Sequence, residues 1–255
     1  MIASILFSAA LVASPPAGPA HGAPAHNAPA APAHAAPVGA PTFAQALQRL
    51  KDGNIRYATG YAKHPRQDSG GRLNVSQSQA PFAIVLTCAD SRVAPEIVFD
   101  QGLGDLFVVR IAGNVADTLA LASMEYAVEH LHSSLIVVMG HERCGAVKAT
   151  LDATKAPAPA TGHAAEAHHS HIPALVKEIE PAIWAAKGRT GPELDACIES
   201  NVEHSAGQIT SRSDIIRQFV ADGKVQIVGG VYDLDTGRVN WLSSVPQSAF
   251  VRVRR

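Results

Sequence analysis

The chain has 255 residues, 21 basic and 22 acidic side chains and no block of either sign, which suits one α/β domain with appendages and a sizeable core. It lacks the basic stretches of nucleic-acid-binding proteins, so we expect no nucleic-acid partner. Three cysteines are too few for a disulfide framework, and they do not indicate a redox compartment.

The first 41 residues differ in composition from the rest. Residues 2–13 are an apolar run followed by small residues, typical of the hydrophobic region of a secretory signal, although no Lys or Arg precedes it. At about 12 residues the run is too short for a stable membrane span. Residues 14–41 are almost entirely Ala, Pro, Gly and His, which predicts a disordered leader. We therefore expect a periplasmic or secreted protein, or a cytoplasmic one if the leader is not a signal.

The ordered domain is predicted to span residues 42–255 and to begin with an amphipathic helix, because Thr42 and Gln45 match a capping box. Residues 60–80 are polar without a sustained pattern and are predicted to be largely irregular. A His-rich stretch at about 152–172 is interpreted as a surface insertion. Helical patterns cover residues 116–130, 143–150, 173–187 and 192–222, and Cys197 in the last of them is predicted to pack in the core.

Short apolar runs separate these helical patterns. They are rich in branched residues and predict strands at 82–87, 106–111, 135–140, 225–231 and 239–242, the last at an edge. Strands that alternate with helices indicate an α/β fold, in which a mostly parallel central β-sheet is flanked by helices on both faces.

Two of these strands are followed by residues that can bind a metal. Cys88, Asp90 and Arg92 follow the first strand, and His141 and Cys144 follow the third. Open α/β sheets place their ligands at strand ends, so the two groups are predicted to meet there. Cys and His suit zinc, and Cys144 is expected at a helix N-terminus. An arginine two positions after Asp90 can pair with that carboxylate and keep it off the metal.

On these paired motifs the chain resembles the β-class carbonic anhydrases, from about Thr42 to the C-terminus. The resemblance implies a zinc enzyme that interconverts carbon dioxide and bicarbonate. It implies one Zn²⁺ per chain with Cys88, His141 and Cys144 as ligands, and an Asp90/Arg92 dyad in which Asp90 either fills the fourth zinc position or pairs with Arg92.

The resemblance also implies a substrate pocket. It assigns bicarbonate binding to Gln79, pocket lining to the aromatic rings of Phe107 and Tyr126, and a backbone donor to Gly145. In the family part of this pocket comes from a second subunit, which implies a homodimer or a larger assembly of dimers. Val85 stands where members with an allosteric bicarbonate site carry tryptophan, so the non-allosteric type is expected.

The expected chemistry is attack by zinc hydroxide on carbon dioxide, with Asp90 accepting the hydroxide proton and Arg92 holding Asp90. Two alternatives stay open. One is a hydrolase of carbon disulfide or carbonyl sulfide within the same family. The other, of a different class, is a structural or zinc-storage protein in which Cys88, Asp90, His141 and Cys144 close the site permanently.

Overall fold

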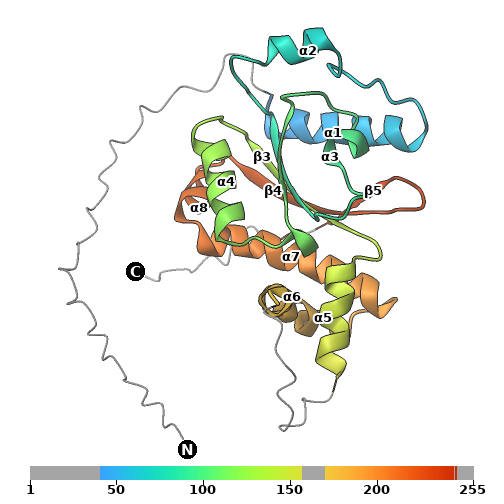
Figure 1. Ribbon diagram of the computed structural model, residues 1–255. Coiled ribbons are helices and arrows are strands. Elements are labelled where there is room, and N and C mark those ends of the chain that lie inside the picture. The colour runs from blue at the N-terminus through green and yellow to red at the C-terminus, as the bar shows by residue number, and fades with distance from the viewer. Residues whose placement is uncertain (1–40, 157–169, 244, 246–255) are drawn as a thin grey trace, which may run out of the picture. The chain divides into compact units, whose positions relative to one another are not determined.

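A five-stranded sheet in the order β2-β1-β3-β4-β5 forms the centre of the fold (Figure 1). The computed structural model describes residues 41–156, 170–243 and 245. The first four strands are parallel and β5 pairs antiparallel with β4, which confirms the mostly parallel sheet and its edge strand. The strands are β1 (Ala83–Thr87), β2 (Leu106–Arg110), β3 (Leu135–His141), β4 (Gln226–Tyr232) and β5 (Val239–Trp241).

Helices cover both faces of this sheet. In Figure 1, α1 and α3 lie on one face, α4, α7 and α8 on the other, and α5 and α6 pack against α7. The described helices are α1 (Phe43–Ala58), α2 (Ser69–Asn74), α3 (Pro95–Val98), the 3₁₀ helix η1 (Ala112–Asn114), α4 (Thr118–Glu129), α5 (Gly145–Lys155), α6 (Ile172–Ala185), α7 (Glu193–Arg212) and α8 (Asp214–Ala221).

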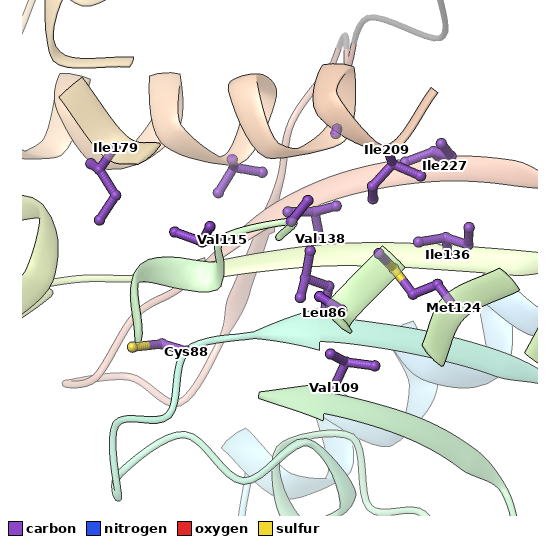
Figure 2. Close-up of a cluster of buried hydrophobic side chains, with 14 of the residues drawn as sticks. Leu86, Cys88, Val109, Val115, Met124, Ile136, Val138, Ile179, Ile209 and Ile227 are labelled. Carbon is purple, nitrogen blue, oxygen red and sulfur yellow. The ribbon is translucent and has the colours of Figure 1, made fainter. Parts of the chain in front are cut away.

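The central strands are buried on both sides, as their apolar composition predicted. Side chains that alternate along β1 enter two different clusters: Ile84 and Leu86 pack under α4 and α7, whereas Ala83 and Val85 pack with α1 and α3. Figure 2 shows part of the first cluster, with Cys88 at its margin where β1 ends. The core therefore holds β1 rigidly up to the first residue of the predicted metal site.

The predicted starts of two helices agree with the structure. The Thr42 side chain accepts a hydrogen bond from the Gln45 N–H, and Gln45 bonds back to the Thr42 N–H, so the capping box of α1 is confirmed. Cys144 is the residue before α5, at its N-terminus, as expected.

Residues 60–80 are largely irregular, as predicted, with one exception: residues 69–74 form α2, because the Asp68 side chain accepts from the Gly71 N–H and caps a short helix. One prediction of local structure was wrong. The single helix expected over residues 192–222 is two helices, α7 and α8. Ser213 is extended between them, and its hydroxyl accepts from the Ile216 N–H at 3.1 Å to begin α8.

The His-rich insertion is shorter than predicted where the structure describes its ends. Residues up to Lys155 continue α5, and α6 already begins at Ile172. Residues 157–169 of the insertion and residues 1–40 of the signal-like leader lie outside the described residues. Among the helices of the described part, none combines the length and apolarity needed to cross a bilayer.

Candidate metal centre

The ends of β1 and β3 bring the two predicted groups together. These strands are parallel neighbours with Thr87 opposite Met139, so the residues that follow them emerge at the same edge of the sheet. The Sγ atoms of Cys88 and Cys144 and a ring nitrogen of His141 all lie within 4.8 Å of one another. All three side chains are buried, with exposed fractions of 4% or less. The predicted meeting of the two motifs is therefore found.

The pKa values of the two thiols are shifted in opposite directions. A hydrogen bond from Cys144, together with the backbone N–H groups of Asp90 and Gly113, lowers the pKa of Cys88 to about 4 against the opposing effect of burial. The same hydrogen bond and burial raise the pKa of Cys144. The pair thus favours a thiolate at Cys88, and a thiolate is the form of cysteine that binds a metal ion.

The imidazole of His141 is oriented towards the sulfur atoms. Its Nδ1 lies 2.9 Å from the carbonyl oxygen of Glu142, so Nδ1–H donates and Nε2 keeps its lone pair. Nε2 is buried and has no hydrogen-bond partner within the described part of the chain. Two sulfurs and an unpartnered imidazole nitrogen are the donors that zinc prefers, so these residues fit a zinc ion.

Asp90 lies beside this group but pairs with Arg92. Its Oδ2 accepts from Arg92 Nη2 at 2.7 Å, and its Oδ1 accepts from Arg92 Nε at 2.9 Å and from the Arg92 backbone N–H at 3.0 Å. These bonds hold the pKa of Asp90 well below its usual range. Asp90 Oδ2 is nevertheless only 3.9 Å from His141 Nε2. The carboxylate is thus ionised, fixed and next to the three donors.

The matches with known proteins agree with this geometry. A family model described as carbonic anhydrase matches residues 83–239. Carbonic anhydrase of Mycolicibacterium smegmatis is 43% identical over 76% of this chain and 90% of its own length, and carbonic anhydrase 2 of Mycobacterium tuberculosis is 39% identical over 76% and 89%. A Coccomyxa β-carbonic anhydrase, solved in complex with acetazolamide, superimposes with a TM-score of 0.57 at 31% identity over 77% of this chain and 86% of its own.

The chain belongs to the β-carbonic anhydrase family. It is an enzyme of that family, whose general reaction is the reversible hydration of carbon dioxide to bicarbonate. The resemblance read from the paired motifs is confirmed.

The carbonic anhydrase pocket residues inferred from the resemblance do not all meet in this chain. Phe107 and Tyr126 contact each other, with ring centroids 6.4 Å apart, yet among the described residues no hydrogen bond or ring contact links them to the three metal-binding side chains. Tyr126 is 48% exposed and Gln79 is exposed. Gly145 is the first residue of α5, where helix amides lack an intrahelical acceptor.

Arg110 is a contributor to the carbonic anhydrase site that sequence reasoning missed. It ends β2, opposite Thr87, and donates from Nε to the Cys88 carbonyl at 3.2 Å and from Nη2 to the Asp90 carbonyl at 2.6 Å. The sequence held one indication of a role for Arg110: it is the single charged residue of a strand whose other residues are all apolar. Its target could be known only once β2 was placed beside β1.

Arg143 is a second missed residue, in the other ligand loop of the enzyme. Its guanidinium binds Asp235 in a bidentate pair at 2.8 and 2.9 Å, which ties the loop to the β4–β5 hairpin. Its backbone has a φ of 52°, a left-handed value that a non-glycine residue rarely adopts. Nothing in the local sequence indicates this conformation.

Proposed function

We propose that this chain hydrates carbon dioxide reversibly with one zinc ion held by Cys88, His141 and Cys144. The observation that carries the proposal is the convergence of three buried donors while Arg92 holds the neighbouring Asp90 carboxylate. Three protein ligands with one position left open are typical of catalytic zinc, whereas structural zinc usually has four protein ligands.

When bound, zinc would lower the pKa of a water molecule and so supply hydroxide, the nucleophile that attacks carbon dioxide, near neutral pH. The chain itself would orient that nucleophile. Asp90 Oδ2 lies 3.9 Å from His141 Nε2, where it would accept a hydrogen bond from the nucleophile and so orient it towards the substrate. Arg92 keeps Asp90 ionised and in place for this task.

The bidentate pair also argues against the storage or structural alternative. A permanently closed centre would need Asp90 as its fourth ligand, and the Arg92 guanidinium competes for the same two oxygens. A centre with only a structural role gains nothing from such a competitor. No contact in the described residues favours a sulfur-containing substrate over carbon dioxide.

We propose further that the substrate pocket is completed by a second copy of the chain. Tyr126 is half exposed, its ring is tilted against that of the partly buried Phe107, and Gln79 is exposed. A partly exposed aromatic pair of this kind suits an interface between two copies. The resemblance assigns these same residues to a pocket shared between subunits.

Stopped-flow measurement of carbon dioxide hydration by the zinc-loaded chain, from about pH 6 to 9, tests the main proposal. We expect activity that rises with pH, because deprotonated water is the nucleophile. Stoichiometric zinc with no hydration activity anywhere in this range would overturn it. Release of sulfide from carbon disulfide or carbonyl sulfide by that inactive protein would then identify the alternative hydrolase.

A further inference from the structure

The segment between β2 and α4 passes beside the metal-binding side chains and contacts one of them. The Gly113 N–H in η1 donates to Cys88 Sγ at 3.3 Å. Gly113 has a φ of 66°, and a Cβ added there would lie 2.6 Å from Ile179 Cδ1, so neither the backbone nor the space suits another residue. Figure 2 shows Cys88 beneath the turn that leads to Val115. The Cys88 sulfur therefore depends on how this turn is held.

Helix α7 holds the turn from the opposite side with polar side chains. Asn201 Nδ2 donates to the Gly113 carbonyl at 2.7 Å and to Asn114 Oδ1 at 3.4 Å. Asn114 Nδ2 in turn donates to Ser205 Oγ at 3.4 Å, one helical turn after Asn201. Two turns further on, Arg212 Nη1 donates to the Ala116 carbonyl at 3.0 Å. One face of α7 thus binds the whole turn from residue 113 to residue 116.

The described hydrogen bonds of the Asn201 side chain are made to the turn and not to other residues of α7. Asn201 is 1% exposed, and its neighbours along α7, Ile198 and Val202, belong to the apolar core cluster. Its Oδ1 is buried and has no partner within the described residues, so both of its described hydrogen bonds go through Nδ2 to the turn. Burying an amide with one unpaired atom is costly, and an apolar residue would pack this face without that cost.

We propose that Asn201 is a positioning residue for the metal centre. Its amide fixes the carbonyl side of Gly113 while Cys88 Sγ lies on the N–H side, so the conformation of one glycine links α7 to a zinc ligand. The N–H donated to Cys88 stabilises the thiolate that would bind the metal. This inference rests on the proposed zinc site.

The test compares zinc retention in Asn201→Ala and Ser200→Ala, each prepared as the zinc-loaded full chain. Ser200 is the matched control, because it is 2% exposed on the same helix and donates to the Ala182 carbonyl at 2.8 Å, away from the turn. Zinc affinity is measured by competition with a chromophoric chelator. We expect affinity to fall about tenfold in Asn201→Ala and to stay unchanged in Ser200→Ala, although both lower the melting temperature.

Replacing zinc with cobalt gives an absorption spectrum that depends on the geometry of the metal site. A general loss of packing in the core would not change this spectrum. The thiolate-to-cobalt absorption band of Asn201→Ala should shift from that of the unsubstituted chain, whereas that of Ser200→Ala should coincide with it. Equal zinc affinity and identical cobalt spectra in both variants would overturn the inference. If Asn201→Ala does not fold, Asn201→Ser answers the same question, because its shorter side chain also loses the bond to Gly113.

Failure of the proposed zinc site gives a different result. In that case the unsubstituted chain fails to retain zinc against the chelator, or Cys88→Ala retains it as well as the unsubstituted chain. Failure of the Asn201 inference leaves both of those measurements intact and removes only the difference between Asn201→Ala and Ser200→Ala.

Discussion

The two loops that supply the metal-binding side chains are held in different ways. The loop after β1, residues 88–92, is held by side chains: Arg110 binds the carbonyls of Cys88 and Asp90, and Arg92 binds the Asp90 carboxylate. Both guanidinium groups belong to exposed residues. The bonds on the outer side of this loop can therefore exchange with water and re-form.

The loop after β3, residues 141–144, is held mainly by secondary structure. His141 still pairs with Tyr232 in the sheet, and the Glu142 N–H donates to the Tyr232 carbonyl at 3.0 Å. Cys144 then directly begins α5. Arg143 also pairs with Asp235, and both of these side chains are exposed.

This difference suggests which part of the site can move. His141 and Cys144 sit between a strand and a helix, so they cannot shift without disturbing the sheet. Asp90 is fixed by one arginine and can leave it by local rotation. Two firmly held candidate ligands thus lie opposite a carboxylate with a single side-chain partner, an arrangement compatible with the two positions of Asp90 that the resemblance implies.

The largest expected effect is loss of a ligand from the rigid loop. Cys144→Ala should lower zinc affinity and hydration activity by more than ~100-fold, because a first ligand matters more than the contacts that orient it. Cys197→Ala is the control, since Cys197 is equally buried on α7 but is not one of the three side chains that meet at the ends of β1 and β3. Zinc content and stopped-flow rates measure both. Zinc retained at full occupancy by Cys144→Ala would contradict the assignment.

Releasing the adjustable carboxylate should have the next largest effect. Arg92→Ala removes the bonds that hold Asp90, so Asp90 is expected to move to the open metal position and activity to fall about 100-fold. Zinc content should stay at that of the unsubstituted chain, which separates this variant from Cys144→Ala. Full hydration activity in Arg92→Ala would show that the pair has no role in the reaction.

Substituting one arginine at each loop compares the two loops directly. Arg110→Ala should lower activity about tenfold, because the carbonyls of Cys88 and Asp90 lose their anchor. Arg143→Ala removes an exposed ion pair and should change both stability and activity very little, since the strand and helix still hold that loop. Equal losses of activity in the two variants would remove the distinction between the loops.

The smallest effect on activity is expected far from either loop, at Asp100. This buried carboxylate accepts from the Lys63 and His64 N–H groups and from Arg56 Nε at 2.6 Å. Burial alone would raise its pKa, but these bonds outweigh burial and the pKa of Asp100 is lowered. Asp100→Asn should destabilise the fold at pH 7 by about 2 to 3 kcal/mol, because charged hydrogen bonds are lost.

The pH dependence of the stability lost in Asp100→Asn follows from the direction in which the pKa of Asp100 is shifted. A carboxylate whose folded pKa is lowered stabilises the native state above its unfolded pKa of about 3.9, and this contribution is lost as pH falls through the lower folded value. Denaturant unfolding of both proteins should therefore show the difference between them shrinking below about pH 4. A difference that stays constant down to pH 2 would mean that folding does not lower the pKa of Asp100.

The sheet, its flanking helices and the three side chains that meet at the sheet edge could be predicted from the amino-acid sequence. Branched apolar runs mark strands buried on both faces, and chemistry-bearing residues directly after two such runs must emerge at one edge of a parallel sheet. The pairing of Asp90 with Arg92 could also be expected, because the two residues are close in sequence. The break at Ser213 was missed because the apolar pattern runs on through it.

The contacts that hold the two loops could be known only from the tertiary structure. Arg110 reaches Cys88 because β2 lies beside β1, Asn201 reaches Gly113 because α7 crosses the sheet there, and Arg143 reaches Asp235 because the β4–β5 hairpin extends past β3. Each of these bonds joins residues distant in sequence, and its formation depends on strand order and helix packing. The periodicity of a sequence predicts which side of a helix or strand faces the core. It does not predict which backbone group a side chain contacts on a distant element.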